Sequence, residues 1–188
     1  MERIESSKIE KLMSIIGDSR RISIVSHLKP DGDALGSCVA MFHFLGQCGK
    51  DDIRIVLPDS YPSYLDFITE GLQEKDILTY SHDSSEAEKA IASSDLIICL
   101  DFNAFHRTDS LENSLETSKA AKILIDHHLN PDTESFDLVF SRTEVSSASE
   151  LLYHILMATP VLNGTAASLD IKASTALMTG MTTDTNNF

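Results

Sequence analysis

The segment ISIVSHLKPDGDALGS, residues 22–37, carries the strongest fold signal in the chain. Residues 22–26 are mostly apolar or β-branched, as in a strand that is covered on both faces. Asp31 and Asp33 flank a glycine, and these residue types favour a turn or a helix cap. From Ala34 to Gln47 the apolar residues recur at helical spacing. A strand, a polar loop and a helix in this order are typical of one unit of an α/β fold.

The same alternation continues along the chain. Short apolar runs predict further strands at 53–57, 96–100, 123–125 and 136–140. Helical spacing of apolar residues predicts helices at 5–18, 34–47, 148–158 and 167–181. The polar stretch 81–88 is predicted to be a loop that leads into a helix. We therefore expect an α/β domain with a mainly parallel β-sheet flanked by helices on both faces.

Composition and charge restrict the classes of function. The 188 residues are enough for one domain with its own core, and the formal net charge is −14. Such a charge argues against gripping of duplex DNA, which needs a dense basic surface. An anionic substrate would have to bind at a local site, where bound divalent cations could offset the charge of the acidic residues. An ordinary acidic, solvated surface is the simpler interpretation of the charge alone.

The cysteines and the N-terminal segment indicate a cellular compartment. Cys38, Cys48 and Cys99 form no CxxC pair, which favours free thiols in a reducing environment. The N-terminal segment lacks the apolar core of a signal peptide, and no run approaches the roughly 18 apolar residues of a transmembrane helix. We therefore expect a cytoplasmic protein without membrane contact.

Polar clusters lie at the carboxyl ends of three predicted strands, where open α/β sheets place ligands. Taken alone, the first cluster could be a turn with a helix cap and Asp101 could be a cap, whereas the adjacent His127 and His128 would need polar partners. Parallel strands end side by side, however, so that carboxylates from distant positions would meet and repel unless cations lay between them. Carboxylates and imidazoles suit Mn²⁺ or similar ions. The clusters are 27–37, 101–103, 126–128 and, at the end of the last predicted helix, 182–185.

These clusters resemble the four metal-site motifs of the DHH phosphoesterase family, in order: HLKPDGDALGS, DFN, DHH and TTDT. The resemblance implies that Asp101 bridges two metals and that His128 lies beside them and contacts the substrate phosphate. Asp101 and His128 are therefore the implied catalytic residues. Asp126 would orient the histidines. The implied ligands of the first metal are His27, Asp31 and Asp101, and those of the second are Asp33, Asp101, His127 and Asp184.

Other residues near the motifs are weaker candidates. Gly36 and Ser37 suit a close approach to the metal loop, although helix packing explains them equally well. Arg107 and the serines of 146–149 are candidates for phosphate contacts. An exposed arginine and an ordinary helix cap are the structural alternatives for them.

The activity implied by the resemblance is phosphoester hydrolysis by metal-activated water, with two divalent cations, Mn²⁺ first and Mg²⁺ as the alternative. The chain contains no GxSxG elbow, Walker loop or GxGxxG motif that would indicate other chemistry. It is most similar to the nanoRNase and 3′-phosphoadenosine-5′-phosphate phosphatase branch, an exonuclease-like class. Short oligonucleotides or phosphorylated nucleotides such as linear dinucleotides are therefore the expected substrates. The alternatives are cyclic-dinucleotide phosphodiesterase, exopolyphosphatase or pyrophosphatase, and a non-catalytic nucleotide-binding module.

The expected domain organisation is one DHH catalytic domain over residues 1–188. Family members carry a second, substrate-binding domain after it, which we expect to be absent from this chain. The sequence leaves open whether the chain forms a homodimer.

Overall fold

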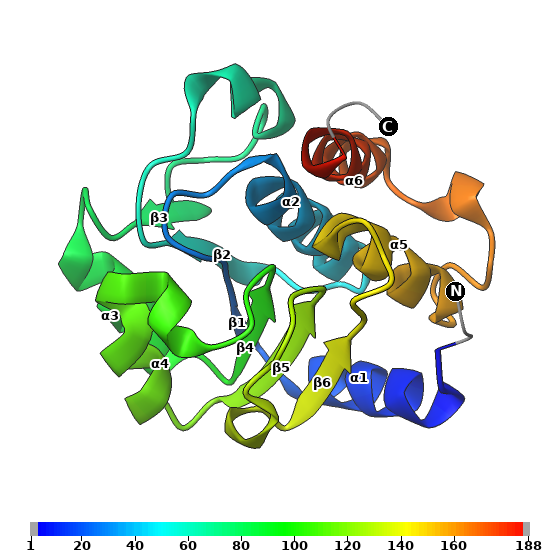
Figure 1. Ribbon diagram of the computed structural model, residues 1–188, viewed down its shortest axis with the longest axis horizontal. Helices are drawn as coiled ribbons and strands as arrows, with labels where there is room; N and C mark the ends of the chain where they lie inside the picture. Colours follow the sequence, from blue (N-terminus) through cyan, green and yellow to red (C-terminus); the bar gives the residue numbers. More distant parts are fainter. Residues whose placement is uncertain (1–3, 186–188) are drawn as a thin grey trace.

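The computed structural model describes residues 4–185 and forms one six-stranded sheet between two layers of helices (Figure 1). All strand pairs are parallel, and the strand order is β3-β2-β1-β4-β5-β6. This confirms the predicted α/β class. The strands are β1 Arg21–Val25, β2 Asp52–Leu57, β3 Ile77–Thr79, β4 Leu96–Leu100, β5 Ala121–Asp126 and β6 Leu138–Ser141.

The helices divide between the two faces of the sheet, with α1, α2, α5 and α6 on one face and α3 and α4 on the other (Figure 1). The α-helices are α1 Ser6–Asp18, α2 Gly32–Gln47, α3 Ser84–Ser93, α4 Glu112–Thr117, α5 Ala148–Ala158 and α6 Ile171–Asp184. Short 3₁₀ helices are η1 Ser63–Ile68, η2 Phe105–Leu111, η3 Thr133–Ser135 and η4 Ala166–Ser168.

Side-chain alternation along the strands separates two buried cores. On β1, Ile22 and Ile24 pack with α1, α2, α5 and α6, whereas Val25 packs with α3 and α4. On β4, Ile98 packs into the first of these cores and Ile97 into the second. Because both faces are covered, the central strands are mostly apolar, as the sequence predicted.

The sequence-based boundaries differ from the structure where local hydrogen bonding overrides composition. Helix α3 begins at Ser84, inside the stretch predicted as loop, because the Asp83 carboxylate accepts the Glu86 amide at 3.1 Å and caps the helix. Helix α6 extends to Asp184, past the predicted end at 181. The three-residue strand β3 at the sheet edge was not predicted, because so short a run carries little periodicity.

Helices α2 and α6 approach each other closely at two glycines. A Cβ on Gly36 would lie 2.5 Å from the Ala176 carbonyl oxygen, and a Cβ on Gly180 would lie 2.8 Å from the Asp33 carboxylate. Both distances are below contact, so only glycine fits. Gly36 thus serves helix packing, one of the two roles left open by the sequence, and the packing sets α6 against the start of α2.

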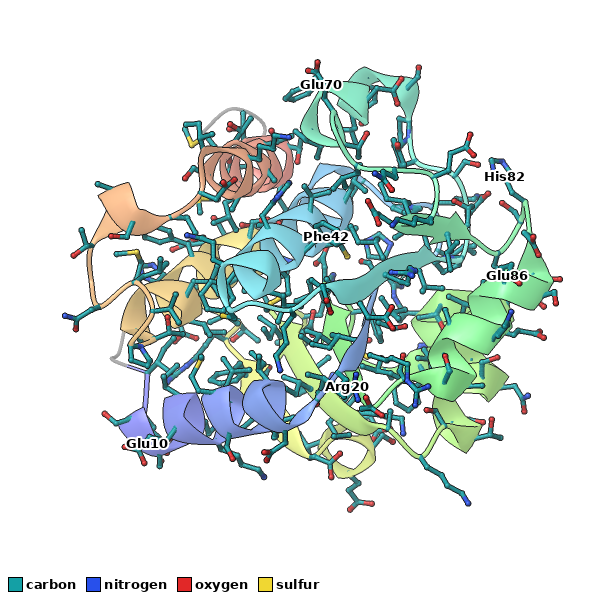
Figure 2. The ribbon with its side chains drawn as sticks, turned by 180° about the vertical axis from the view of Figure 1, so that it is seen from behind. Glu10, Arg20, Phe42, Glu70, His82 and Glu86 are labelled. Carbon is teal, nitrogen blue, oxygen red and sulfur yellow. The ribbon has the colours of Figure 1, made fainter. Side chains whose placement is uncertain are left out.

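Several acidic side chains lie on the outside of the molecule. Glu10, Glu70 and Glu86 are exposed and point outward in Figure 2. Within residues 4–185, no helix combines the length and apolar character needed to cross a membrane.

Candidate metal centre

The predicted site residues converge at the carboxyl edge of the sheet, where the strand order reverses between β1 and β4. His27 lies two residues after β1, Asp101 directly follows β4, and His127 directly follows β5. Because β4 pairs with both β1 and β5, Asp101 lies between the two histidines. Residues 100 positions apart in the sequence are therefore neighbours in space.

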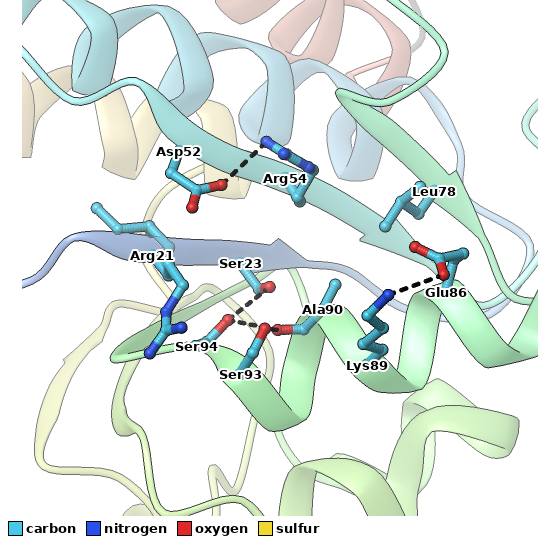
Figure 3. A pocket seen from close by; sticks show the side chains of 11 residues that line it. Arg21, Ser23, Asp52, Arg54, Leu78, Glu86, Lys89, Ala90, Ser93 and Ser94 are labelled. Carbon is cyan, nitrogen blue, oxygen red and sulfur yellow. Dashed lines mark hydrogen bonds and ion pairs between the residues drawn. The ribbon is translucent and has the colours of Figure 1, made fainter.

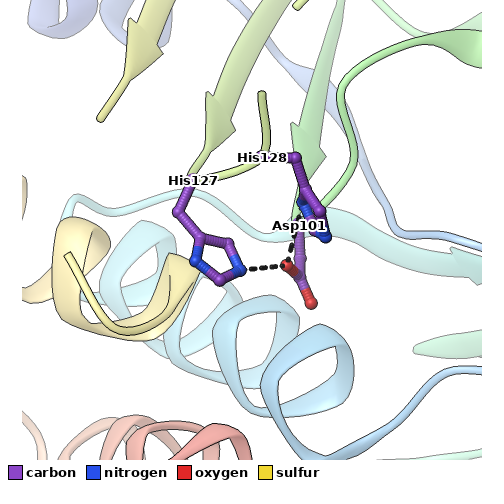
Figure 4. A group of neighbouring side chains, drawn as sticks. All are labelled: Asp101, His127 and His128. Carbon is purple, nitrogen blue, oxygen red and sulfur yellow. Dashed lines mark ion pairs between the residues drawn. The ribbon is translucent and has the colours of Figure 1, made fainter. Parts of the chain in front are cut away.

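Asp101 is the centre of this group. It is 3% exposed, and its two carboxylate oxygens face different histidines: Oδ2 lies 3.4 Å from His27 Nε2, and Oδ1 lies 3.4 Å from His127 Nε2 (Figure 4). Its backbone has φ +63°, a left-handed conformation that is costly for a residue with a Cβ. Such strain is typical of functional sites, and here it turns the carboxylate into the cluster.

The first turn of α2 contributes two carboxylates. Asp31 caps the helix, and its Oδ1 accepts the amides of Asp33 and Ala34, each at 3.0 Å. The same Oδ1 lies 4.0 Å from His27 Nε2. The predicted helix cap at Asp31 is therefore confirmed, and the same carboxylate lies beside the cluster, where its role as a metal ligand stays a prediction. Asp33, by contrast, is 1% exposed and points inward.

The start of α5 holds Asp33 in place. Its Oδ2 accepts the Ala148 amide at 2.6 Å and its Oδ1 accepts the Ser149 amide at 2.9 Å, two free donors of a helix N-terminus. We did not predict this contact from the sequence. A detectable signal was the helix cap at Ser147, whose hydroxyl accepts the Glu150 amide at 3.0 Å.

The same geometry changes the interpretation of the serines at 146–149. The amides that could have met a phosphate are directed to Asp33, and the Ser146 amide and hydroxyl both donate to Glu150. This segment therefore acts as a helix start that supports a carboxylate. Arg107 is exposed, and its carbonyl accepts the Leu28 amide at 2.9 Å, which ties η2 to the loop after β1.

Asp184 reaches the cluster from the last turn of α6. Its Oδ2 lies 3.7 Å from His127 Nε2. The ligand atoms group into three sets in which all atoms lie within 4.8 Å of one another. One set is His27, Asp31 and Asp101; one is Asp33, His127 and Asp184; and one is Asp101, His127 and His128. All six predicted metal ligands thus lie together.

Asp126 fixes the orientation of His128. The Asp126 side chain is fully buried, and its Oδ1 accepts from His128 Nδ1 at 2.7 Å while its Oδ2 accepts the His128 amide at 3.1 Å. This bond occupies Nδ1, so Nε2 is the ring nitrogen left for a substrate. The His128 side chain is 38% exposed, the most open of the three histidines in the cluster.

The electrostatics follow from crowding of like charges. Burial, followed by the charge of Asp101, raises the pKa of Asp33 to about 7. The neighbouring carboxylate of Asp101 raises the pKa of His127 to about 9. Burial alone would raise the pKa of Asp101, but the neighbouring His127 and His27 outweigh this effect. The pKa of Asp101 therefore lies below its ordinary value. In the metal-free chain, protonated imidazoles therefore balance the carboxylates.

These residues fit divalent cations. Within residues 4–185, the buried Oδ1 of Asp101 accepts no hydrogen bond, although buried carboxylate oxygens normally do. The 3.4 Å gaps to His27 and His127 exceed the roughly 2.7–2.9 Å of a strong charged hydrogen bond. Oxygen and imidazole nitrogen donors suit Mn²⁺ or a similar ion. Cations between Asp101 and its neighbours would satisfy that oxygen and remove the repulsion.

The histidine pKa gives a first testable prediction. In the metal-free chain, NMR titration should give His127 a pKa near 9, and Asp101→Asn should return it toward 6.5. Because the folded pKa is the higher one, this interaction stabilises the fold fully below about pH 6.5 and is lost as the pH rises through about 9. A His127 pKa at or below 6.5 in the unaltered chain would contradict the described geometry.

A separate hollow of about 220 Å³ lies at the amino ends of β1 and β2, the opposite edge of the sheet (Figure 3). The charged groups that line it are paired within the protein, and Arg21 lies 3.6 Å from Asp95. Arg54 Nη1 lies 3.3 Å from Asp52, and Lys89 Nζ lies 3.3 Å from Glu86. The hollow shares no residue with the cluster around Asp101.

Comparison with known proteins places the chain in a family. The model of the DHH family, N-terminal domain, matches residues 21–181. The crystal structure of an exopolyphosphatase-related protein from Bacteroides fragilis superposes with a TM-score of 0.90 at 34% identity, over 100% of this chain and 53% of that one.

Curated relatives are more distant and much longer. The cyclic-di-AMP phosphodiesterase GdpP of Geobacillus thermodenitrificans is 25% identical over 181 residues, covering 94% of this chain and 26% of that protein. A probable manganese-dependent inorganic pyrophosphatase of Streptococcus mutans is 27% identical over 169 residues, covering 88% of this chain and 48% of that protein. The chain thus spans half or less of these relatives. With the family model matching residues 21–181, which hold the cluster from His27 to His128, the chain belongs to the DHH family.

Proposed function

We propose that the chain is the catalytic domain of a phosphoesterase that depends on two divalent cations, Mn²⁺ first. The observation that carries the proposal is the position of Asp101, whose two carboxylate oxygens face His27 on one side and His127 on the other. A carboxylate placed between two ligand sets in this way could be shared by two cations. His27 and Asp31 complete one set, and Asp33, His127 and Asp184 complete the other.

When bound, such a pair of cations would lower the pKa of a bound water, and the positive charge of the cations would stabilise the phosphate oxygens. The protein's own part is to hold the ligands rigidly. The α5 amides fix Asp33, the α2 cap fixes Asp31, and the bond from His27 Nδ1 to the Leu28 carbonyl at 2.8 Å turns His27 Nε2 toward Asp101. Rigid ligands keep the centre assembled between turnovers.

His128 is the proposed contact to the substrate phosphate. In the metal-free chain the bond to Asp126 raises the pKa of His128, so the ring takes up a proton more readily than a free imidazole. Its Nε2–H would then donate to a phosphate oxygen and stabilise the charge that develops there. His128 does not need to act as a nucleophile, so no covalent enzyme intermediate is required.

The substrate we propose first is a short oligonucleotide, a linear dinucleotide or 3′-phosphoadenosine-5′-phosphate. Cyclic di-AMP is the second candidate, because GdpP aligns over 94% of this chain. Inorganic pyrophosphate or polyphosphate is the third, by similarity to the pyrophosphatase of Streptococcus mutans and the Bacteroides fragilis protein.

A substrate panel tests the proposal. The chain, freed of metal with EDTA, should be inactive on pApA, 3′-phosphoadenosine-5′-phosphate, cyclic di-AMP and tripolyphosphate, and Mn²⁺ should restore cleavage of one class. Release of mononucleotide or phosphate identifies that class. Cleavage that persists without metal, or metal binding without cleavage of any substrate by this chain or by a longer form of it, would contradict the proposal.

A further inference from the structure

Two basic side chains at the carboxyl edge of the sheet have no partner of their own. Within residues 4–185, most lysine and arginine side chains donate to a carbonyl or pair with a carboxylate. The side chains of Lys29 and Arg107 are exposed and make neither kind of contact within that range. Lys29 lies in the loop between β1 and α2, and Arg107 lies on η2, which follows β4. The cluster around Asp101 is built from the same strand ends.

The backbone holds Lys29 and Arg107 close to each other and to the predicted metal ligands. Lys29 is two residues from His27 and two from Asp31, so its Cα lies at most about 7.6 Å from each of theirs. The Arg107 carbonyl accepts the amide of Leu28, the neighbour of Lys29, at 2.9 Å. Both side chains are long, so their cationic ends can meet at one anion beside the cluster.

The loops that carry these two side chains are held in place. The Asn103 side chain donates to the Leu129 carbonyl at 2.9 Å, and the Asp132 amide donates to the Asn103 carbonyl at 2.9 Å, which ties the segment before Arg107 to the loop after β5. Lys29 has φ +55°, a left-handed conformation that is unfavourable for lysine. Backbone strain of this kind is concentrated at functional sites.

Building on the two-cation hydrolysis proposed above, we propose that Lys29 and Arg107 bind a second phosphate group of the substrate, next to the phosphate that is hydrolysed. Two divalent cations carry four positive charges, which four carboxylates of the cluster would offset: Asp31, Asp33, Asp101 and Asp184. The loaded centre would then have little charge left for a further phosphate. In a chain with a net charge of −14, basic side chains must supply it. Lysine and arginine do so through charge-assisted hydrogen bonds to phosphate oxygens.

Such a site favours substrates with at least two phosphate groups. In the dinucleotide pApA the 5′-terminal phosphate is the second group, and in 3′-phosphoadenosine-5′-phosphate it is the phosphate that is not hydrolysed. The dinucleotide ApA has no terminal phosphate to offer to Lys29 and Arg107. The chain should therefore prefer pApA to ApA, whereas two ordinary solvated side chains would produce no such preference.

NMR of the metal-free chain tests the phosphate contact without any hydrolysis. In EDTA, protonated imidazoles balance the carboxylates of the cluster, so AMP can approach. AMP should shift the side-chain Nε–H signal of Arg107, and adenosine, which has no phosphate, should not. Arg20, exposed just before β1 at the opposite edge of the sheet, is the internal reference (Figure 2). Lys29→Gln should raise the Kd for AMP by about tenfold. An AMP shift at Arg107 no larger than that at Arg20 would overturn the proposal.

Kinetics with Mn²⁺ test the role in specificity. Lys29→Gln and Arg107→Gln should each raise the KM for pApA by about tenfold with little change in kcat, and reduce the preference over ApA. Arg107→Lys, which keeps the charge, should restore part of the loss. The matched controls are Arg20→Gln and Lys119→Gln, which remove one positive charge at exposed residues of the amino edge and should leave the KM unchanged. An equal rise of the KM in the controls would overturn the proposal.

The two experiments separate this phosphate site from the proposed hydrolysis. An AMP shift at Arg107 in a chain that cleaves no substrate, alone or in a longer form, supports the phosphate site and contradicts the hydrolysis. Cleavage of pApA and ApA with the same kcat/KM supports the hydrolysis and overturns the phosphate site. Circular dichroism of Lys29→Gln and Arg107→Gln should match the unaltered chain, because both side chains are exposed.

Discussion

Asp101→Asn is expected to abolish hydrolysis, lowering kcat/KM by roughly 10³-fold or more, because in the proposed centre two cations would share this carboxylate and each would supply several kcal/mol of charge stabilisation. The amide keeps the size of the side chain but removes the charge that offsets His27 and His127. Asparagine also tolerates the left-handed backbone at φ +63°, so the fold should survive. Steady-state kinetics with saturating Mn²⁺ measure the effect.

Asp109→Asn is the matched control. Asp109 is also an aspartate with positive φ, at +49°, but it is exposed on η2 and belongs to none of the ligand groups. The control should retain the activity of the unaltered chain. If Asp101→Asn kept more than a tenth of that activity, a bridging role for Asp101 would be wrong.

Gly180→Ala should both destabilise the fold and weaken metal binding. The added methyl group would overlap Ser149 and approach the Asp33 carboxylate to 2.8 Å, so α6 or Asp33 must move. Overpacking of this kind costs about 1–3 kcal/mol, which corresponds to roughly 2–12 °C in Tm for a chain of this size. The Kd for Mn²⁺ should rise as well, because Asp33 and Asp184 both depend on this contact.

Gly46→Ala is expected to keep or raise the stability of the fold, in contrast to Gly180→Ala. A Cβ at Gly46, near the end of α2, meets nothing within 4 Å, and alanine favours the helix by up to about 1 kcal/mol. Thermal unfolding should therefore place Gly46→Ala at or above the unaltered chain and Gly180→Ala well below it. Equal Tm values for the two variants would contradict the close packing of α2 and α6.

Much of the architecture could be predicted because the central strands are apolar and bounded by polar residues. The run at 96–100 became β4 with the same bounds, and the helix predicted at 148–158 became α5 without change. Strand β3 and the start of α3 escaped prediction, since they depend on edge pairing with β2 and on the cap at Asp83.

The cluster itself was predictable for the same reason. Each of its groups follows a strand or ends a helix, and parallel pairing brings the ends of β1, β4 and β5 to one edge. What the sequence could not provide was the support of Asp33 by the α5 amides, or the role of Gly180. Both depend on helices more than 100 residues away from α2, and the residues at 147–150 indicate a helix start without indicating which side chain contacts it.

Metal stoichiometry tests the central claim most directly. Isothermal titration of the EDTA-treated chain with Mn²⁺ at neutral pH, with the bound metal counted after dialysis, should give two ions per chain. Protons should be released on binding, because His127 must lose its proton to act as a ligand. A chain that is folded by circular dichroism and binds no Mn²⁺, or binds one ion that Asp101→Asn leaves in place, would contradict the account.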